Sequence, residues 1–452
     1  MKKLDVVIKN IYKLSVTSIF LIIITMLCFY NATSTSYLIN WEHTAYVKDS
    51  VVMNIIFTLC AVLVAFYIGK SKSYHAMSMR VSQDKEFRKW KRIIIGCTFI
   101  LSVIWALSTQ FVPGIDEYAI QTAVREVMQG DFSSFQHMAY MDQYPNQWGF
   151  FLFSYVIACF FGKMNFLVIE LLIALAIAVV FKELSELSAL LGAKNIEQLI
   201  VLLMGIIYFP FLLYSTMVYG NIFGIAFALA AIKHEMLFFK TNKKRNALQC
   251  SIFIALGILM KSNMQIYFLA ILFAALVNIV GNPKKVISLV VLVCLAYYTQ
   301  EITVKMIIKL LTNSQLSAPI TPFAWIAMGL QDGDLAPGWW NSYSVNSYYS
   351  CDGDISLHAL VCKESIKNSI IGFINSPSKA IDFFTKKILS TWTNPTFQCF
   401  GTVSEGSYVI TPYWVNRLLS YSGQYLVTKY LNILCFMIYI GCLLYTSPSP
   451  RD

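Results

Sequence analysis

The sequence predicts an all-α polytopic membrane protein, and its composition and apolar patterning carry this prediction. Apolar residues make up 57% of the 452 residues, charged residues only 13%, and the mean hydropathy is +0.60. A soluble domain of average composition carries about 25% charged residues. The apolar residues also gather in long segments, which is the pattern of helices that cross a lipid bilayer. We therefore expect lipid to be the solvent for much of the chain.

Residues 1–305 are expected to form a transmembrane domain with about nine spans. Each span needs roughly 20 mainly apolar residues to cross the hydrocarbon core. The first apolar run, Leu14–Tyr30, follows a basic start as in a signal peptide, but no convincing small-residue cleavage site follows it. We therefore expect it to be an uncleaved span. The segments centre on 14–34, 51–69, 93–112, 164–182, 197–216, 221–239, 248–262, 265–281 and 286–304.

The charged loops between these segments predict which side of the membrane each one faces. The loop 70–92 carries eight Lys and Arg residues against two acidic ones, so it is expected in the cytoplasm, together with Lys240–Arg245 and the N-terminus. The loop 113–146 holds five acidic residues against Arg125 alone, so we expect it outside. Because the basic residues lie in short runs between apolar segments, the net charge of +11 predicts topology and no binding of nucleic acid.

Residues 147–162 are apolar, but they are too few for a full span. Sixteen residues reach about 24 Å as a helix, and the hydrocarbon core is about 30 Å thick. If this segment crossed the membrane, Lys240–Arg245 would face outside. If it lies at the interface, or dips in and returns, every basic cluster faces the cytoplasm. We expect the second arrangement, an outer juxtamembrane helix within a catalytic loop 113–162.

This topology places four regions together on the outer face: 113–162, Ser215–Asn221, Lys261–Gln265 and 306–430. The last region is rich in Trp, Tyr, Ser and Asn, so it is expected to be a C-terminal extracytoplasmic region. Within it, the apolar residues from Ser365 to Trp392 have helical spacing, which predicts an amphipathic helical hairpin.

The end of the chain carries a segment that does not resemble natural protein sequence. The last eleven residues, 442–452, resemble the translation of a sequencing adapter. The apolar run Leu431–Leu444 has only 14 residues before a Pro-rich stretch, fewer than a span needs. We therefore expect 431–441 to begin a further span, 442–452 to be artefactual, and the natural protein to continue beyond Gly441.

The strongest candidates for chemistry lie in the outer loops. Asp116 and Glu117 follow a Pro-Gly turn at the end of the third span, where a partly desolvated carboxylate is able to act as a general base. The alternative is a solvated acidic surface. Lys261 ends an apolar segment with no acidic residue within four positions, so it either binds an anion or snorkels to the interface. Arg125 offers a guanidinium for a phosphate, or pairs with Glu126 or Asp131.

Short motifs in these loops resemble those of one enzyme superfamily. The motifs are the acidic pair Asp116-Glu117, YPNQ at Tyr144–Gln147, VYGN at Val218–Asn221, MKSN at Met260–Asn263, and the phrases Trp325–Leu330 and Thr391–Phe397. Together they resemble the GT-C superfamily of membrane glycosyltransferases. More narrowly, the chain is similar over most of 90–400 to bacterial multispan enzymes related to protein O-mannosyltransferases, which use polyprenyl-phosphate sugars.

The resemblance implies a GT-C-like multispan helical bundle and roles for particular residues. Asp116 matches the catalytic carboxylate of the first outer loop, and Glu117 matches its acidic neighbour. Lys261 matches a basic residue near the carrier phosphate, with Arg125 as a second candidate. Asn221 stands where many relatives carry a second acidic residue, which argues against a shared metal site, so no metal or other cofactor is expected. The remaining expected substrate-binding residues are Tyr144, Asn146 and Gln147.

The expected function is transfer of a sugar from a polyprenyl-phosphate carrier to an acceptor hydroxyl on the outer face of a bacterial plasma membrane. The acceptor is expected to be a cell-envelope glycan, a protein or a lipid. Two alternatives remain open from the residues. A polysaccharide polymerase or ligase would rely on outer Arg and His residues, and 306–430 holds one of each. A transporter or flippase of carrier-linked glycans would place ionisable residues within its spans.

Overall fold

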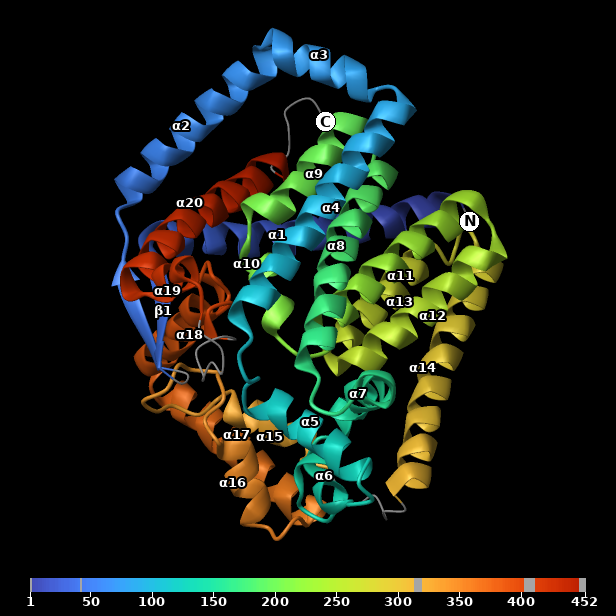
Figure 1. The fold of residues 1–452 in the computed structure, drawn as a ribbon, viewed down its shortest axis with the longest axis vertical. Coiled ribbons are helices and arrows are strands. Elements are labelled where there is room, and N and C mark those ends of the chain that lie inside the picture. Colours follow the sequence, from blue (N-terminus) through green and yellow to red (C-terminus); the bar gives the residue numbers. More distant parts are fainter. Residues whose placement is uncertain (1, 41–42, 313–318, 402–410, 447–452) are drawn as a thin grey trace.

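The computed structural model describes residues 2–40, 43–312, 319–401 and 411–446, and these are predominantly α-helical (Figure 1). Among them, six helices are long and apolar enough to cross a membrane, or up to eight if each of two bent pairs forms one span. The expected all-α multi-pass membrane protein is confirmed at this level. The six are α1 (Lys2–Thr33), α2 (Val51–Lys70), α4 (Asp84–Thr109), α11 (Asn221–Thr241), α14 (Pro283–Thr312) and α20 (Tyr421–Thr446).

Not every span expected before residue 305 is a long helix in the structure, and the count of about nine stays a prediction. Two expected spans are the short helices α12 (Lys244–Met260) and α13 (Gln265–Val277), of 17 and 13 residues. They reach about 25 and 20 Å, less than the hydrocarbon core. The apolar run breaks between them, at Lys261 and the 3-10 turn η4 (Ser262–Met264). The structure thus has a polar turn at Lys261–Met264, where the sequence predicts an outer turn between these two segments.

The bent pairs account for two further expected spans. The apolar helix α7 (Trp148–Phe161) meets α8 (Phe166–Leu190) at a bend of 119°. The helices α9 (Asn195–Ile207) and α10 (Pro210–Leu213), the latter running into the turn η3 (Tyr214–Thr216), form the second pair, bent by 57°. Because of its sharp bend, the first pair is not one straight span, as expected for a helix that lies along an interface or dips in and returns.

The ends of the expected extracytoplasmic region shift in the structure. Helix α14 continues to Thr312, beyond the expected boundary at 305, and α20 begins at Tyr421 instead of near 431. The early start of α20 has a physical reason, because its polar first half has a buried partner. Lys429 pairs with Asp49 at 2.5 Å, and Asn432 donates to the same carboxylate at 3.1 Å. Residues 442–446 continue this helix, and 447–452 lie outside the described residues.

A β-hairpin after α1 was not expected from the sequence. Its strands β1 (Ser34–Asn40) and β2 (His43–Lys48) pair antiparallel. A two-stranded hairpin is only marginally stable alone. Here Ser36 binds the end of α18 (Pro377–Trp392), its N–H donating to Thr393 O at 3.0 Å and its hydroxyl to Leu389 O at 3.1 Å.

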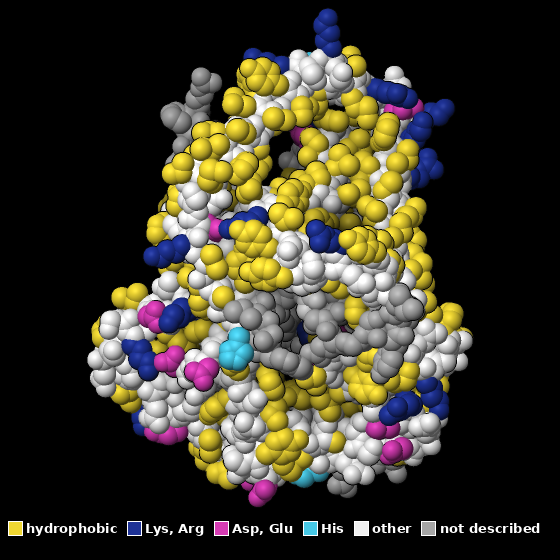
Figure 2. Space-filling model, turned by 60° about the vertical axis from the view of Figure 1, so that its left-hand side comes forward, with side chains coloured by type: hydrophobic (Ala, Val, Ile, Leu, Met, Phe, Trp, Pro, Cys, Tyr) yellow, Lys and Arg dark blue, Asp and Glu magenta, His cyan; other side chains and the backbone are white. Residues whose placement is uncertain are grey.

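Helix α4 joins two ends of the molecule that differ in character (Figure 1). Helix α3 (Lys72–Val81) lies at one end, and α5 (Ile115–Val127) and α6 (Tyr140–Gln143) lie at the other, with α15 (Pro322–Met328), α16 (Tyr343–Tyr349) and α17 (Ile355–Asn375). Near Trp105 of α4, α19 (Tyr413–Leu419) packs against the turn that follows α10. Figure 2 shows hydrophobic side chains over much of the upper part of one face, beneath Lys and Arg side chains at its top edge. The basic and acidic loops therefore lie at opposite ends, as the charge pattern predicts.

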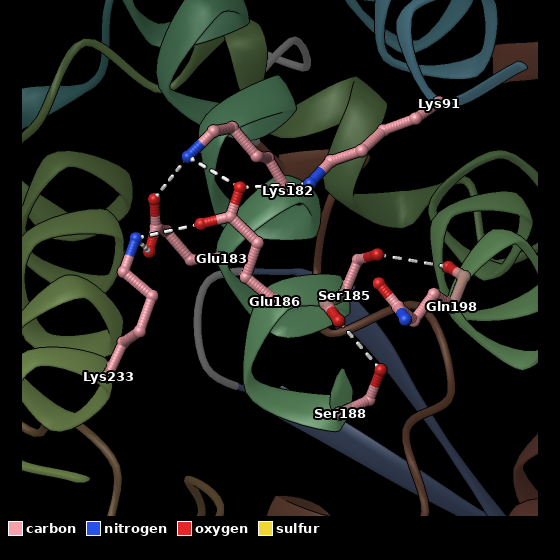
Figure 3. A network of polar contacts seen from close by, with 8 residues as sticks. All are labelled: Lys91, Lys182, Glu183, Ser185, Glu186, Ser188, Gln198 and Lys233. Carbon is pink, nitrogen blue, oxygen red and sulfur yellow. Dashed lines mark hydrogen bonds and ion pairs between the residues drawn. The ribbon is translucent and has the colours of Figure 1, made fainter. Parts of the chain in front are cut away.

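A cluster of charged side chains, of which Glu183 is buried, links three helices (Figure 3). Lys233 of α11 lies 2.5 Å from Glu183 and 2.8 Å from Glu186, both on α8. Lys91 of α4 lies 2.9 Å from Glu186, and Lys182 of α8 contacts both carboxylates at 2.8 and 3.2 Å. We call these five residues the lysine–glutamate network. The charge count of 70–92 predicts only which side of the membrane this loop faces. In the structure, Lys91 also forms an ion pair that links α4 to α8.

Candidate functional site

The acidic pair expected to carry the chemistry lies in the first turn of α5. The Glu117 carboxylate accepts a hydrogen bond from the Gly114 N–H at 2.8 Å, which closes the turn that follows Pro113. Carboxylates are stabilised here because the N-terminus of a helix carries a partial positive charge. Asp116 is exposed, whereas Glu117 is half-buried. The turn thus holds the Glu117 carboxylate, whereas the Asp116 carboxylate stays accessible to solvent.

Two tyrosines lie beside this carboxylate, the half-buried Tyr140 and the buried Tyr219. Burial raises the pKa of Tyr140 well above its usual value, and the neighbouring Tyr219 and the Asp116 charge raise it further. Burial and the Asp116 carboxylate likewise raise the pKa of Tyr219 above its usual value. The Tyr140 hydroxyl hydrogen-bonds with Asp116, and the two tyrosine hydroxyls interact with one another. Both phenols therefore stay neutral and present O–H donors around the acidic pair.

Lys261 brings a cation to the same cluster from the end of α12. Its Nζ lies 3.8 Å from the centroid of the Tyr219 ring, which is a cation–π contact. Burial lowers the pKa of Lys261 to about 8, and the charges of Asp116 and Glu117 oppose that shift. The ammonium group therefore faces an aromatic ring and two carboxylates. A lysine that snorkels would instead extend its charge into the interface.

Two glycines fix the position of Lys261 against its neighbours. A Cβ on Gly220 would lie 1.9 Å from the Met260 carbonyl oxygen, and a Cβ on Gly149 would lie 1.8 Å from that of Leu259. Both contacts are with the backbone of the last turn of α12, so no side-chain rotation relieves them. The loop before α11 and the start of α7 therefore pack directly against the residues that precede Lys261.

Replacing Gly220 by Ala is expected to destabilise the protein by about 1–3 kcal/mol, because the added methyl group forces two backbones apart. The melting temperature of the detergent-solubilised protein should fall, and sugar transfer should fall with it as Lys261 is displaced. Gly96→Ala in α4 is the matched control, since a Cβ there meets nothing within 4 Å. Equal melting temperatures for both variants would contradict the close approach at Gly220.

The YPNQ segment supplies contacts to the cluster from the residues before α7, including the 3-10 turn η2 (Pro145–Gln147). The buried Gln147 amide donates to the Tyr219 hydroxyl, and its Oε1 has no hydrogen-bond partner among the described residues. Tyr144 packs on Tyr140 with ring centroids 4.8 Å apart and on Trp325 of α15 at 6.2 Å. Asn146 is exposed on the surface. Tyr144 and Gln147 thus join the cluster directly.

Asn221 opens α11 directly after Gly220. Its side chain is half-buried, and its Oδ1 is enclosed without a hydrogen-bond partner among the described residues. A buried acceptor that lacks a donor costs free energy, which a bound hydroxyl or amide would recover. Gln147 shows the same feature, so two amides next to Tyr219 each have an unused acceptor.

Arg125 does not join this cluster. It follows Asp116 by nine residues on α5, which turns it by about 180° around the helix and carries it about 13 Å along the axis. The carboxylates expected to pair with it bind elsewhere: Glu126 accepts from the Ser134 hydroxyl, and Asp131 accepts from the Ser133 N–H at 2.9 Å. The expected role of Arg125 beside Lys261 is therefore not supported by its position.

Sequence reasoning missed Tyr140 and Tyr219, and one signal pointed to the second of them. Tyr219 lies within VYGN, two residues before Asn221, the residue singled out from that motif. Tyr140 lies four residues before Tyr144 with no motif of its own. Among the described residues, no group of three or more His, Cys, Asp or Glu side chains is placed to hold a metal ion.

Comparisons of this chain with protein-family models, with curated proteins and with solved structures found no match. Its functional interpretation therefore proceeds from the residues of the site.

Proposed function

We propose that this protein is a membrane glycosyltransferase, which transfers a sugar from a polyprenyl-phosphate carrier to an acceptor hydroxyl. The observation that carries the proposal is the cluster in which Asp116, Lys261 and two neutral tyrosines meet at one end of the helical bundle. The charge pattern of the loops supports an outer location for this end. The motif resemblance to GT-C enzymes supports the same reaction class.

The reaction needs a base and a cation on opposite sides of the sugar. The acceptor hydroxyl attacks the anomeric carbon, its proton passes to the Asp116 carboxylate, and the bond from that carbon to the phosphate oxygen breaks. The departing polyprenyl phosphate takes the bonding electron pair, and Lys261 stabilises its charge. Since a phosphate is already a reasonable leaving group, no strong general acid is required. Tyr140 orients Asp116 through its hydroxyl.

Two features of the structure weigh against the alternative functions. A polymerase or ligase would use outer Arg and His residues, but the one His of 306–430, His358, is fully buried, with its Nε2 at 2.9 Å from the Ser347 hydroxyl. An exposed His, His137, lies in the loop 113–146. A transporter would place ionisable groups along a path through its spans. The lysine–glutamate network instead pairs its charges with one another. Two further buried acidic residues of these helices, Glu170 of α8 and Glu235 of α11, lie outside the network.

Lys261→Met tests the leaving-group role. The substitution keeps an apolar stem and removes the charge, so donor turnover should fall about 10²-fold, the usual cost of one lost electrostatic contact to a transition state. Release of polyprenyl phosphate from a radiolabelled donor, measured at limiting donor in native membranes that overproduce the protein, reports the rate. A wild-type rate for Lys261→Met would remove Lys261 from the reaction.

The pH profile separates charge from shape at the same position. Because the pKa of Lys261 is about 8, its charge is lost as the pH rises through 8, and the wild-type rate should fall there. Lys261→Arg keeps its charge to much higher pH, so it should retain activity and lose this alkaline limb. Lys305→Met is the control, since Lys305 is exposed and, among the residues that the structure describes, pairs with Glu301 alone, at 2.7 Å.

A further inference from the structure

A cavity of about 750 Å³ lies among α16, α17, the start of α18 and the segment that follows α15. This volume falls within the range of small-molecule sites, roughly 300–1,000 Å³. No residue of the proposed catalytic cluster lines it, and the proposed chemistry does not use it. It is therefore a separate concavity at the α5 end of the molecule, and its lining indicates what it binds.

The lining combines aromatic rings with uncharged hydrogen-bonding groups. Tyr343 and Phe373 supply ring faces and edges, and Gln331, Ser365 and Asn368 supply amide and hydroxyl groups. Sugar rings offer C–H faces that pack on aromatic rings and hydroxyls that both donate and accept hydrogen bonds. The lining therefore has both kinds of group that a saccharide needs.

The charges around the cavity cancel locally. Lys379 pairs with Asp332 at 3.0 Å across the cavity, and Glu364 pairs with Lys367 at 3.4 Å. An anionic ligand would require an excess of positive charge, and a purely apolar ligand would require an apolar lining. A peptide added as a strand would need an exposed sheet edge, whereas the described walls are helices and a loop. A neutral polyhydroxylated ligand fits best.

Gly372 forms part of the cavity wall within α17, and packing does not explain it. A Cβ at this position would meet nothing within 4 Å. Glycine inside a helix costs about 0.5–1 kcal/mol relative to alanine. In this structure, the missing side chain leaves this exposed part of the cavity wall uncovered.

Helix α15 links the cavity to the proposed catalytic cluster. Its Trp325 packs on Tyr144 of the cluster. Just beyond the helix, Gln331 donates to Ala327 O at 3.0 Å and to the Ser365 hydroxyl at 3.1 Å. Because α15 has only seven residues, it is about 10 Å long. Helix α15 and the residues that follow it thus touch both the cavity wall and the cluster.

We infer that this cavity is a binding subsite for a neutral oligosaccharide of the acceptor, an inference that rests on the proposed glycosyltransferase function. The subsite would hold the acceptor glycan through its non-reacting sugars. Binding energy gained away from the reacting centre is able to position the reactive hydroxyl. The acceptor class is then a glycan, and a protein acceptor is the competing outcome of the test below.

The test is direct binding to the full-length protein in detergent, measured by calorimetry. The probes are trisaccharides of mannose, glucose and N-acetylglucosamine, and a Ser/Thr-rich decapeptide. At least one trisaccharide should bind, and Gly372→Phe, which fills the cavity, should weaken it at least tenfold. Asn368→Ala should weaken it by up to tenfold through the lost hydrogen bond. Gly96→Ala in α4, outside the cavity, should leave binding intact.

The readout distinguishes failure of this subsite from failure of the proposed reaction. Asp116→Asn should bind the trisaccharide like the wild type, because Asp116 does not line the cavity. The inference is overturned if no trisaccharide binds at roughly 1–10 mM, the weakest useful range. Trisaccharide binding that is unchanged in both Gly372→Phe and Asn368→Ala, or decapeptide binding that Gly372→Phe abolishes, also overturns it. Each of these outcomes leaves the transfer reaction to be judged by its own assay.

Discussion

Asp116→Asn is expected to lower sugar transfer by roughly 10²–10⁴-fold, the usual contribution of a general base. The amide is nearly isosteric with the carboxylate and still accepts a hydrogen bond from Tyr140, so the fold should be preserved. It is unable to take the proton of the acceptor hydroxyl, so the barrier rises by about 3–5 kcal/mol. The measurement is transfer from a radiolabelled polyprenyl-phosphate sugar in membranes, with expression and melting temperature matched to the wild type.

Neighbouring substitutions provide the controls for this result. Glu117→Gln should cost less than Asp116→Asn, because an amide oxygen still accepts from the Gly114 N–H. Tyr140→Phe removes only the hydroxyl that hydrogen-bonds with Asp116, so its effect should be intermediate. Near-wild-type transfer by Asp116→Asn with an inactive Glu117→Gln would exchange the two roles. Full activity in both variants and in the double variant would remove the start of α5 from the chemistry.

The sequence predicts Asp116 and Lys261 as candidates because each polar residue directly follows a long apolar run. It does not predict the residue that connects them. Tyr219 contacts Lys261 through its ring and Gln147 through its hydroxyl, and both contacts depend on the tertiary approach at Gly149 and Gly220. Such an approach involves helices distant in the sequence, so local spacing does not reveal it.

The fold, like the site, is predictable where it depends on residues close together in the sequence and is not predictable where it depends on distant ones. Hydropathy predicts α2 and α11 to within two residues of their ends, because burial in lipid depends only on the residues of each helix. Helix α4 instead begins at Asp84, nine residues before the expected segment 93–112. The hairpin of β1 and β2 could not be predicted this way, because it is anchored at Thr393, more than 350 residues away.

Lys233→Met is expected to destabilise the protein by about 3–5 kcal/mol, the usual cost of removing one partner from a buried ion pair. Lys233 is the only residue of α11 in the lysine–glutamate network, and it contacts both Glu183 and Glu186 (Figure 3). Its loss leaves the Glu183 side chain, which is 5% exposed, with Lys182 alone. The melting temperature in detergent should fall by several degrees, and α11 should separate from α8 more readily.

Two further variants separate the effect of the unpaired Glu183 carboxylate from the effect of lost side-chain packing. Lys182→Met removes a lysine of the same network whose side chain is 37% exposed, so solvent replaces it and the cost should stay below about 1 kcal/mol. Adding Glu183→Gln to Lys233→Met removes the unpaired carboxylate, so the double variant should melt at a higher temperature than Lys233→Met alone. If the double variant is less stable than that single variant, the loss comes from packing of the lysine stem and the network is not what joins α8 to α11.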